Sequence, residues 1–249
     1  MRIKVAVLGA KGRMGATTCA AINDAVDLDL VAALDLDDDL NSLVTSGAQV
    51  VVDFTHPDSV MENLEFAIKN GINVVVGTSG FNSTKLESIQ AWLSENPKVG
   101  VLIAPNFGLG AVLMMQFAAQ ASKYFESVEI IELHHPNKAD APSGTATRTA
   151  ELITEARASV KKEAMPDATS SELQGARGAK VGDVPIHSVR LRGLVAHQEV
   201  ILGDLGEILS IRHDSMDRTG FMPGVLLGIR KVIETPGLTF GLEHFLDLK

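Results

Sequence analysis

The residues of this chain best suited to chemistry lie in one stretch of fifteen, 132–146, which we call the His-His-Lys segment. It reads Glu-Leu-His-His-Pro-Asn-Lys-Ala-Asp-Ala-Pro-Ser-Gly-Thr-Ala. His134 and His135 can exchange protons near neutral pH, because imidazole titrates there, and Lys138 adds a positive charge. The Ser-Gly-Thr sequence opens a predicted helix, whose first backbone N–H groups can bind an anion. The segment therefore predicts a site for a small, doubly negative substrate that must be protonated.

Other interpretations of this segment start from the same residues. Each histidine alone is also typical of a hydrogen-bonded structural residue, and the neighbouring Lys138 and helix start favour a site. A zinc ion held by His134, His135 and Asp140 is disfavoured, because adjacent histidines rarely bind one ion together and no neighbouring cysteine or H-E-x-x-H spacing is present. Ser143 lacks the G-x-S-x-G turn of a serine nucleophile. We therefore expect proton transfer and anion binding, with no metal.

A second motif, Gly9-Ala10-Lys11-Gly12-Arg13-Met14-Gly15, follows a predicted strand and opens a predicted helix. We call it the glycine turn. Glycines let the backbone approach a pyrophosphate, which then lies at the helix N-terminus. The spacing G-x-x-G-x-x-G matches the usual G-x-G-x-x-G fingerprint only with Ala10 as its first small residue. Asp35, twenty residues past Gly15, can bind the adenosine ribose. The motif predicts dinucleotide binding; helix–strand packing alone is the alternative.

The charges around the glycine turn bear on the choice of cofactor. Asp35 favours NADH, because a carboxylate repels the 2′-phosphate of NADPH. Lys11 and Arg13 can pair with that phosphate and offset the repulsion; a solvated loop surface is the other interpretation of these two side chains. The sequence therefore fits NADH, NADPH or both.

The first part of the chain alternates short β-rich runs with helical stretches. The pattern predicts strands at 3–8, 28–34, 50–54, 73–76 and 99–104, and helices at 16–25, 59–69 and 84–94. This α/β alternation indicates a doubly wound, Rossmann-like parallel sheet. Two loops, Gly77-Thr78-Ser79-Gly80 and Ala104-Pro105-Asn106-Phe107, then lie at its carboxyl edge, where such folds bind ligands. They are candidates for the nicotinamide end of the cofactor, with ordinary turns as the alternative.

The pattern changes in the second part of the chain. We predict helices at 110–123, 143–157 and 222–233, strands at 128–133, 186–191, 197–202 and 207–212, and a long loop at 161–185. Consecutive strands indicate a second, α+β domain with a mixed or antiparallel sheet. We therefore expect a dinucleotide-binding domain at 1–106, to which 215–249 returns, and a domain for substrate binding and oligomerisation at 107–214.

Composition limits the classes of partner. The chain has 249 residues and a net charge of −9, and an acidic surface repels nucleic acids and anionic membranes. No run reaches the ~20 apolar residues of a membrane span, and the first residues enter a strand pattern directly, with no signal peptide. The single cysteine, Cys19, fits a reducing compartment and a buried structural thiol. We expect a cytoplasmic protein that binds neither nucleic acid nor membrane.

The whole His-His-Lys segment resembles the E-x-H-H-x-x-K-x-D-A-P-S-G-T-A signature of the 4-hydroxy-tetrahydrodipicolinate reductase family, also called dihydrodipicolinate reductases. The likeness extends, in family order, to the glycine turn, Asp53-Phe54-Thr55, Gly77-Thr78-Ser79-Gly80-Phe81 and Ala104-Pro105-Asn106-Phe107. These blocks span nearly the whole chain. The long signature is highly specific, whereas the glycine turn alone is not.

The resemblance implies an enzyme of the diaminopimelate route to lysine, which reduces a cyclic dicarboxylate with NADH or NADPH. It implies that His134 is the acid/base, that Lys138 is a second proton donor, and that His135, Gly144 and Thr145 bind the substrate. The cofactor residues that it implies are Gly9, Ala10, Lys11, Gly12, Arg13, Met14, Asp35, Gly77, Thr78, Ser79, Ala104, Pro105, Asn106 and Phe107. It further implies a homotetramer joined through the sheet of the second domain. Leu36 departs from members with a basic residue there, so recognition of a 2′-phosphate would depend on the glycine turn.

Two other functions compete with the reductase as interpretations of this sequence. Another two-domain NAD(P)-dependent dehydrogenase with an amino-acid-like substrate would share the glycine turn but not the long signature. A non-catalytic NAD(H)-sensing module would not need two histidines and a lysine beside an anion-binding turn. For the reductase we expect domain closure, with hinges near Phe107 and His213–Ser215, since cofactor and acid lie on different domains.

Overall fold

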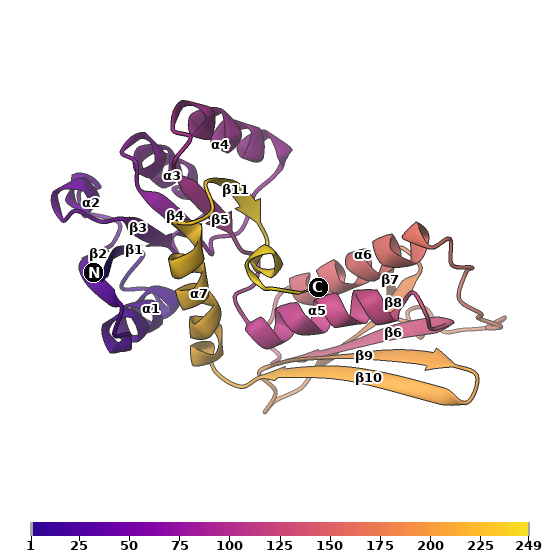
Figure 1. The fold of residues 1–249 in the computed structure, drawn as a ribbon. Coiled ribbons are helices and arrows are strands. Elements are labelled where there is room, and N and C mark those ends of the chain that lie inside the picture. The colour runs from indigo at the N-terminus through magenta and orange to yellow at the C-terminus, as the bar shows by residue number, and fades with distance from the viewer. Residues whose placement is uncertain (1, 249) are drawn as a thin grey trace. The chain divides into compact units, whose positions relative to one another are not determined.

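The computed structural model describes residues 2–248 and divides into two compact units. Unit 1 combines the chain up to Leu109 with the chain from Arg218 onward, and unit 2 is Gly110–Asp217. Each unit has its own sheet (Figure 1).

The sheet of unit 1 is parallel throughout. Its strands are β1 (Ile3–Leu8), β2 (Leu28–Leu34), β3 (Val50–Asp53), β4 (Asn73–Val76), β5 (Gly100–Ile103) and β11 (Gly237–Phe240), in the order β11-β5-β4-β3-β1-β2. Val50, Val51 and Val52 are completely buried, as continuous apolar strands must be when helices cover both faces. The order reverses at β1, since β2 and β3 pair on opposite sides of it.

Helices cover both faces of this sheet. They are α1 (Arg13–Asp24), α2 (Asn41–Thr45), α3 (Val60–Lys69), α4 (Ser83–Glu95) and α7 (Met222–Val232), with short 3-10 turns at Arg218–Phe221 and Leu242–Phe245. Helices α1 and α7 pack together on one face, and α3 packs with α4 on the other (Figure 1). This arrangement confirms the predicted doubly wound, Rossmann-like class.

Strand register places four chain segments at one edge of this sheet. Leu8 pairs with Asp53, Asp53 with Val76, and Val76 with Ile103, so four strands end in one row. The glycine turn and the three segments that begin at Phe54, Gly77 and Ala104 therefore leave the sheet side by side. This edge lies at the reversal of strand order, where open α/β sheets bind ligands.

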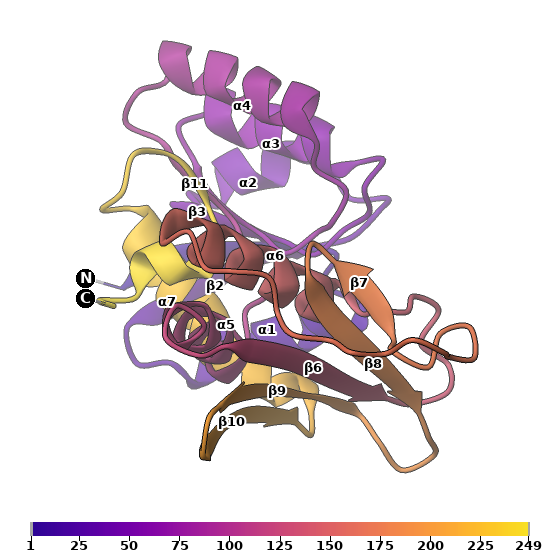
Figure 2. The ribbon, with the colours of Figure 1, turned by 90° about the vertical axis from the view of Figure 1, so that its right-hand side faces the viewer.

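Unit 2 contains a mixed sheet. Its strands are β6 (Ser127–His134), β7 (Ala179–Val181), β8 (Val184–Arg190), β9 (Ala196–Asp204) and β10 (Glu207–Ser215), in the order β10-β9-β6-β8-β7. Strands β6 and β8 are parallel, and the other pairs are antiparallel. Helices α5 (Leu109–Ala121) and α6 (Gly144–Ser159) lie on the same side of the sheet (Figure 2). The predicted mixed or antiparallel sheet is confirmed.

Several predicted boundaries are wrong. The loop expected at 161–185 ends in strand β7, a tight turn and the start of β8, because Gly182 adopts a left-handed conformation (φ 58°) between the two strands. Helix α1 begins at Arg13 rather than at residue 16, so the glycine turn runs directly into it. The short elements α2 and β11 had no predicted counterpart.

Candidate active site

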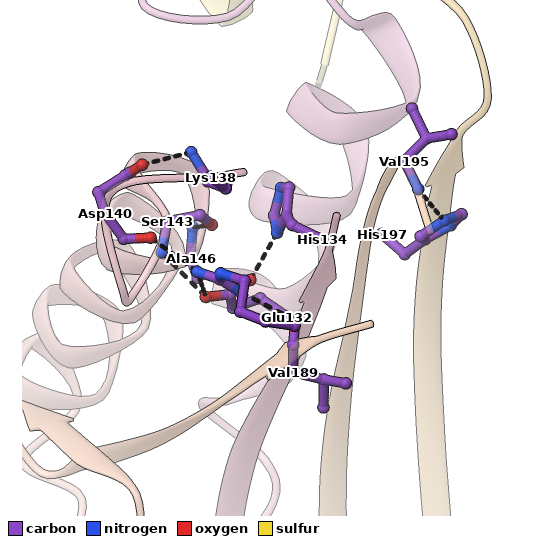
Figure 3. Close-up of polar contacts among 10 residues, drawn as sticks. Glu132, His134, Lys138, Asp140, Ser143, Ala146, Val189, Val195 and His197 are labelled. Atoms are coloured by element: carbon purple, nitrogen blue, oxygen red, sulfur yellow. Dashed lines mark hydrogen bonds and ion pairs between the residues drawn. The ribbon is translucent and has the colours of Figure 1, made fainter. Parts of the chain in front are cut away.

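The acidic residue that opens the His-His-Lys segment is completely buried. Glu132 lies near the end of β6, and its exposed fraction is 0%. Residues two apart on a strand share a face, so His134, the last residue of β6, projects on the same side. Its Nδ1 lies 2.5 Å from Glu132 Oε2 (Figure 3). Strand geometry therefore pairs the imidazole with a buried carboxylate.

An arginine from the neighbouring strand compensates the charge of this carboxylate. Arg190, at the end of β8, donates from Nη1 to Glu132 Oε2 and from Nη2 to Oε1, both at 2.8 Å. The backbone N–H of Ser143 donates to Oε1 at 3.2 Å. Burial alone raises the pKa of Glu132, but hydrogen bonds from Arg190, Ser188 and His134 outweigh it and hold that pKa below its ordinary value. Glu132 is therefore an ionised, fully engaged acceptor at neutral pH.

His134 is a shielded imidazole whose side chain is only 13% exposed. Burial lowers its pKa, and the hydrogen bond and charge of Glu132 partly oppose that shift. The charges of Lys138 and Arg190 lower the pKa further. The proton of the imidazolium is therefore held less tightly than usual, which suits a group that gives it away.

Lys138 and the start of α6 lie close to this histidine (Figure 3). The ammonium Nζ of Lys138 donates to Asp140 Oδ1 at 2.7 Å. That contact is the largest cause of a lowered pKa for Asp140, and the backbone N–H of Gly144 contributes in the same direction. The carboxylate of Asp140 thus interacts with an ammonium and a helix N-terminal amide, the two kinds of donor that a substrate carboxylate would use.

Ser143 and Gly144 have different roles at this helix start. The Ser143 hydroxyl oxygen accepts from the Ala146 backbone N–H at 3.2 Å, and its side chain is buried as the N-cap of α6. Gly144 is exposed, and a Cβ there would meet no heavy atom within 4 Å. The helix start therefore needs the Ser143 side chain as its cap, whereas no neighbouring atom would prevent a side chain at position 144. His135 is exposed, and Thr145, which follows Gly144 in the helix, is half-buried.

In unit 1 the glycine turn is tightly folded on itself. Gly9 is left-handed (φ 75°), and a Cβ there would lie 2.6 Å from the Phe54 carbonyl oxygen. A Cβ on Gly15 would overlap the Gly9 carbonyl oxygen. Gly12 is the N-cap of α1 and provides no side-chain cap, so the first amides of the helix are available to an external acceptor. These glycines form a backbone cradle that fits a pyrophosphate.

Asp35 lies beside this cradle, as predicted from its position after β2. Its Oδ2 accepts from the Lys11 backbone N–H at 2.8 Å, and its Oδ1 accepts from the Leu36 backbone N–H at 3.0 Å. The hydrogen bonds from Leu36 and then Lys11 lower the pKa of Asp35. The acid is therefore ionised and held against the glycine turn, where it fits the ribose of a dinucleotide. The side chains of Lys11 and Arg13 are exposed.

A buried carboxylate that the sequence reasoning gave no role holds the segment after β4. Asp53 Oδ1 accepts from the Thr78 hydroxyl at 2.9 Å and from the Thr55 backbone N–H at 2.9 Å. Its Oδ2 accepts from Asn63 Nδ2 at 2.8 Å. Asp53 thereby links the ends of β3 and β4 to helix α3 and fixes the loop Gly77–Ser79.

The last predicted cofactor segment follows β5 in the same row. Phe107 is buried and meets the Phe54 ring edge to face, with centroids 5.8 Å apart and an interplanar angle of 68°. Asn106 Oδ1 accepts from the Gly108 backbone N–H at 2.8 Å, whereas Pro105 is exposed. The Ala104 backbone N–H donates to the Val76 carbonyl oxygen at 3.0 Å, so Ala104 continues the hydrogen bonding of the sheet. The structure therefore brings the three predicted cofactor segments and Asp35 to one edge of unit 1.

Sequence reasoning gave no role to Glu132, although it belongs to the His-His-Lys segment, and it did not single out Arg190, which contacts Glu132. Arg190 lies 58 residues from Glu132 in the chain, and no local motif marks it. The signal that could have found it is the register of β6 and β8, in which His134 pairs with Arg190.

Within residues 2–248, no three His, Cys, Asp or Glu side chains gather as they would around a metal ion. No helix in the same range combines the length and apolar character needed to cross a membrane.

Comparisons with known proteins agree across the whole chain. Residues 3–107 match the family model "Dihydrodipicolinate reductase, N-terminus", and residues 110–246 match "Dihydrodipicolinate reductase, C-terminus". The chain is 60% identical over 247 residues to 4-hydroxy-tetrahydrodipicolinate reductase of Streptomyces griseus, covering 99% of both chains. It is 60% identical over 248 residues to the enzyme of the same name from Nocardia farcinica, covering 100% of both.

Solved structures give the same result. A dipicolinate-bound dihydrodipicolinate reductase from Paenisporosarcina sp. TG-14 superposes with a TM-score of 0.91 at 40% identity, covering 99% of this chain and 100% of that one. An amine dehydrogenase from Mycobacterium smegmatis, at 13% identity and a TM-score of 0.64 over 96% of this chain and 95% of that one, shares the fold alone. The family models, the full-length relatives and the first of these structures agree, and the chain belongs to the dihydrodipicolinate reductase family, whose members are oxidoreductases that use a nicotinamide cofactor.

Proposed function

We propose that this protein reduces 4-hydroxy-tetrahydrodipicolinate to tetrahydrodipicolinate with NADH or NADPH, in the diaminopimelate route to lysine. The balanced reaction consumes the substrate, NAD(P)H and one proton, and it yields the product, NAD(P)⁺ and water. The observation that carries the proposal is the arrangement of Glu132, His134 and Lys138 at the start of α6. An imidazole beside an ammonium and a helix N-terminus supports a site in which an anionic substrate is protonated.

His134 is proposed to be the proton donor. A bound nicotinamide would supply a hydride. Once the 4-hydroxyl group has left the ring as water, with a proton from the neighbouring carbon, hydride addition leaves electron density on the ring that must be protonated. The half-buried imidazole has a pKa below its ordinary value, so its imidazolium form gives up a proton more readily than a free imidazolium does. Such general acid catalysis accelerates a step by roughly 10²–10⁴. Lys138 is proposed as the second donor and stabilises developing negative charge.

The substrate carboxylates are proposed to replace Asp140 at its donors. The ammonium of Lys138 and the amide of Gly144 now interact with that side chain, and an incoming carboxylate offers them the same chemistry. His135, Gly144 and Thr145 would complete the binding site. The Paenisporosarcina relative is described as binding dipicolinate, a cyclic dicarboxylate, which supports this substrate class.

The cofactor is proposed to bind at the carboxyl edge of the unit 1 sheet. Gly9, Ala10, Lys11, Gly12, Arg13 and Met14 would hold the pyrophosphate, and Asp35 the ribose. Gly77, Thr78, Ser79, Ala104, Pro105, Asn106 and Phe107 would contact the nicotinamide end. Asp35 favours NADH, and the exposed Lys11 and Arg13 side chains are free to reach a 2′-phosphate. We therefore propose that both cofactors are used.

The proposed organisation follows the same division. The N-terminal part with the returning C-terminal segment would be the dinucleotide-binding domain, and the intervening part the domain for substrate binding and oligomerisation. We propose a cytoplasmic homotetramer joined through the sheet of unit 2. Its predicted mass in solution is four times that of the chain, which light scattering measures.

The proposed reaction is tested by mixing purified protein with freshly generated substrate and following the absorbance of NADH or NADPH. We expect one cofactor oxidised per molecule of tetrahydrodipicolinate formed. Thr145→Val should raise KM for the substrate and leave cofactor affinity unchanged. Folded protein that oxidises neither cofactor would refute the reaction, and an unchanged KM in Thr145→Val would remove that residue from the site.

A further inference from the structure

We infer that Glu132, clamped by Arg190, is the positioning residue that fixes the tautomer and orientation of His134. The inference rests on the proposed function, because it concerns the residue proposed as the acid. Neither Glu132 nor Arg190 touches the reacting atoms in this account, and both act through the imidazole.

The contacts of Glu132 leave its carboxylate no freedom to turn. Oε2 meets His134 Nδ1 at 2.5 Å and Arg190 Nη1 at 2.8 Å. Oε1 accepts from Arg190 Nη2 at 2.8 Å and from the Ser143 backbone N–H at 3.2 Å. A guanidinium that binds both oxygens of a carboxylate fixes the plane of the carboxylate and also neutralises its charge. The carboxylate therefore presents one oxygen to the histidine in a single orientation.

This orientation determines which ring nitrogen exchanges protons. A carboxylate oxygen only accepts hydrogen bonds, so the nitrogen that faces it, Nδ1, carries a hydrogen. The other nitrogen, Nε2, lies on the opposite side of the ring and is left to give its proton to the substrate. The reverse tautomer, with its hydrogen on Nε2, would place the lone pair of Nδ1 against the carboxylate. It would also leave Nε2 protonated after the transfer, although Nε2 is the nitrogen that gives its proton to the substrate.

Arg190 also connects the two proposed proton donors. Its Nη2 donates to the backbone carbonyl oxygen of Asp140 at 2.7 Å. Asp140 belongs to the loop between β6 and α6 that carries Lys138 and holds its ammonium at 2.7 Å. One guanidinium therefore anchors both the carboxylate behind His134 and the loop that positions Lys138.

The charges that face His134 come from three segments. Glu132 lies on its own strand, Arg190 on β8, and Lys138, paired with Asp140, on the loop before α6. Only Glu132 favours the imidazolium, while burial, Lys138 and Arg190 oppose it. Removing the carboxylate charge should therefore lower the pKa of His134 further.

The same strand offers a matched control. Glu129 lies on β6 as well, and its Oε2 meets His187 Nε2 at 2.6 Å while its Oε1 pairs with Arg177 Nη2 at 2.5 Å. Glu129, His187 and Arg177 thus form a second Glu-His-Arg arrangement. Among the residues that the structure describes, no hydrogen bond or ion pair joins it to His134. Glu129→Gln therefore perturbs comparable interactions without touching the proposed acid.

The first test compares Glu132→Gln with Glu129→Gln in the whole protein, after light scattering has shown equal oligomeric size. We expect Glu132→Gln to lower kcat about 10²-fold with KM changed less than about threefold. Turnover should fall at high pH as His134 deprotonates, and the midpoint of this fall should lie at a lower pH in Glu132→Gln than in the unaltered protein. Glu129→Gln should change neither. A kcat and pH profile like those of the unaltered protein would overturn the inference.

The second test does not depend on turnover. The exchange of the histidine ring Cε1 hydrogen for deuterium depends on pH and is read by mass spectrometry, with His134 separated from His135 by fragmentation. The midpoint for His134 should fall in Glu132→Gln and stay in place in Glu129→Gln. An unmoved midpoint contradicts the inference even if the unaltered protein fails to reduce the proposed substrate.

Arg190→Lys covers the case in which Glu132→Gln does not fold. Lysine keeps the positive charge but cannot span both carboxylate oxygens. We expect kcat to fall roughly tenfold with unchanged cofactor affinity. Full activity in folded Arg190→Lys, with an unshifted pH profile, would show that the clamp does not position the histidine.

Discussion

The hydrogen bond between Thr78 and Asp53 should set the position of the loop that follows β4. Thr78→Val keeps the branched shape of the side chain and replaces only its hydroxyl, which donates to Asp53 Oδ1 at 2.9 Å, by a methyl group. Thr78 is only 7% exposed, so water cannot easily replace the lost donor. The substitution therefore isolates one contact at the carboxyl edge of the sheet.

The expected magnitude follows from the nature of this bond. A hydrogen bond to a charged group contributes about 1.5–3 kcal/mol, so we expect the free energy of unfolding to fall by about 2 kcal/mol. Asp53 keeps its donors Thr55 and Asn63, which limits the loss. Because the same loop is proposed to contact the cofactor, its dissociation constant should rise severalfold.

Urea unfolding and cofactor titration measure these two effects. Thr235→Val is the control, because the Thr235 hydroxyl donates to a neutral backbone oxygen, that of Lys231, at 3.0 Å. A double-mutant cycle with Asp53→Asn should give a coupling energy of at least about 1 kcal/mol. Zero coupling, or an unchanged cofactor affinity in Thr78→Val, would show that Asp53 does not hold this loop in place for binding.

Three further predictions concern charge and capping. Asp35→Asn keeps an acceptor for the Lys11 amide but removes the charge, so the ratio of kcat/KM for NADPH to that for NADH should rise; an unchanged ratio would contradict the assigned repulsion. Ser143→Ala should cost about 1 kcal/mol in urea unfolding, because its hydroxyl caps α6, and a neutral result would refute the cap. The pKa of Glu132 is lowered on folding, so its contribution to stability is present above its ordinary value of 4.5 and is lost as the pH falls through the folded value. Urea midpoints measured across this range should therefore decline with acid less steeply in Glu132→Gln.

The fold of unit 1 was predictable because its strands are short, apolar and separated by amphipathic helices. The residues at 50–52 are three consecutive valines, a pattern that only a strand covered on both faces explains well. Strand β11 was not predictable in the same way. It is four residues long and partly exposed, and it forms only by pairing with β5 far away in the chain.

The same distinction holds for the site residues: those marked by the local sequence were predictable, and those that depend on contacts between distant segments were not. His134, Lys138 and Asp35 were predicted as site residues because each belongs to a motif or follows a predicted strand end. Arg190 was not, because its role depends on which strands become neighbours. Strands at 128–133 and 186–191 were both predicted, but periodicity does not specify that they pair in parallel, which sets Arg190 opposite His134.

The central claim is that the half-buried imidazole of His134 protonates the substrate, and His134→Gln tests it most directly. The measurement is kcat with the dicarboxylate substrate, beside cofactor affinity and beside His244→Gln, which alters an exposed histidine of unit 1. We expect kcat to fall roughly 10²–10⁴-fold in His134→Gln, with cofactor affinity unchanged, and His244→Gln to behave as the unaltered protein. A fully active His134→Gln would contradict the account.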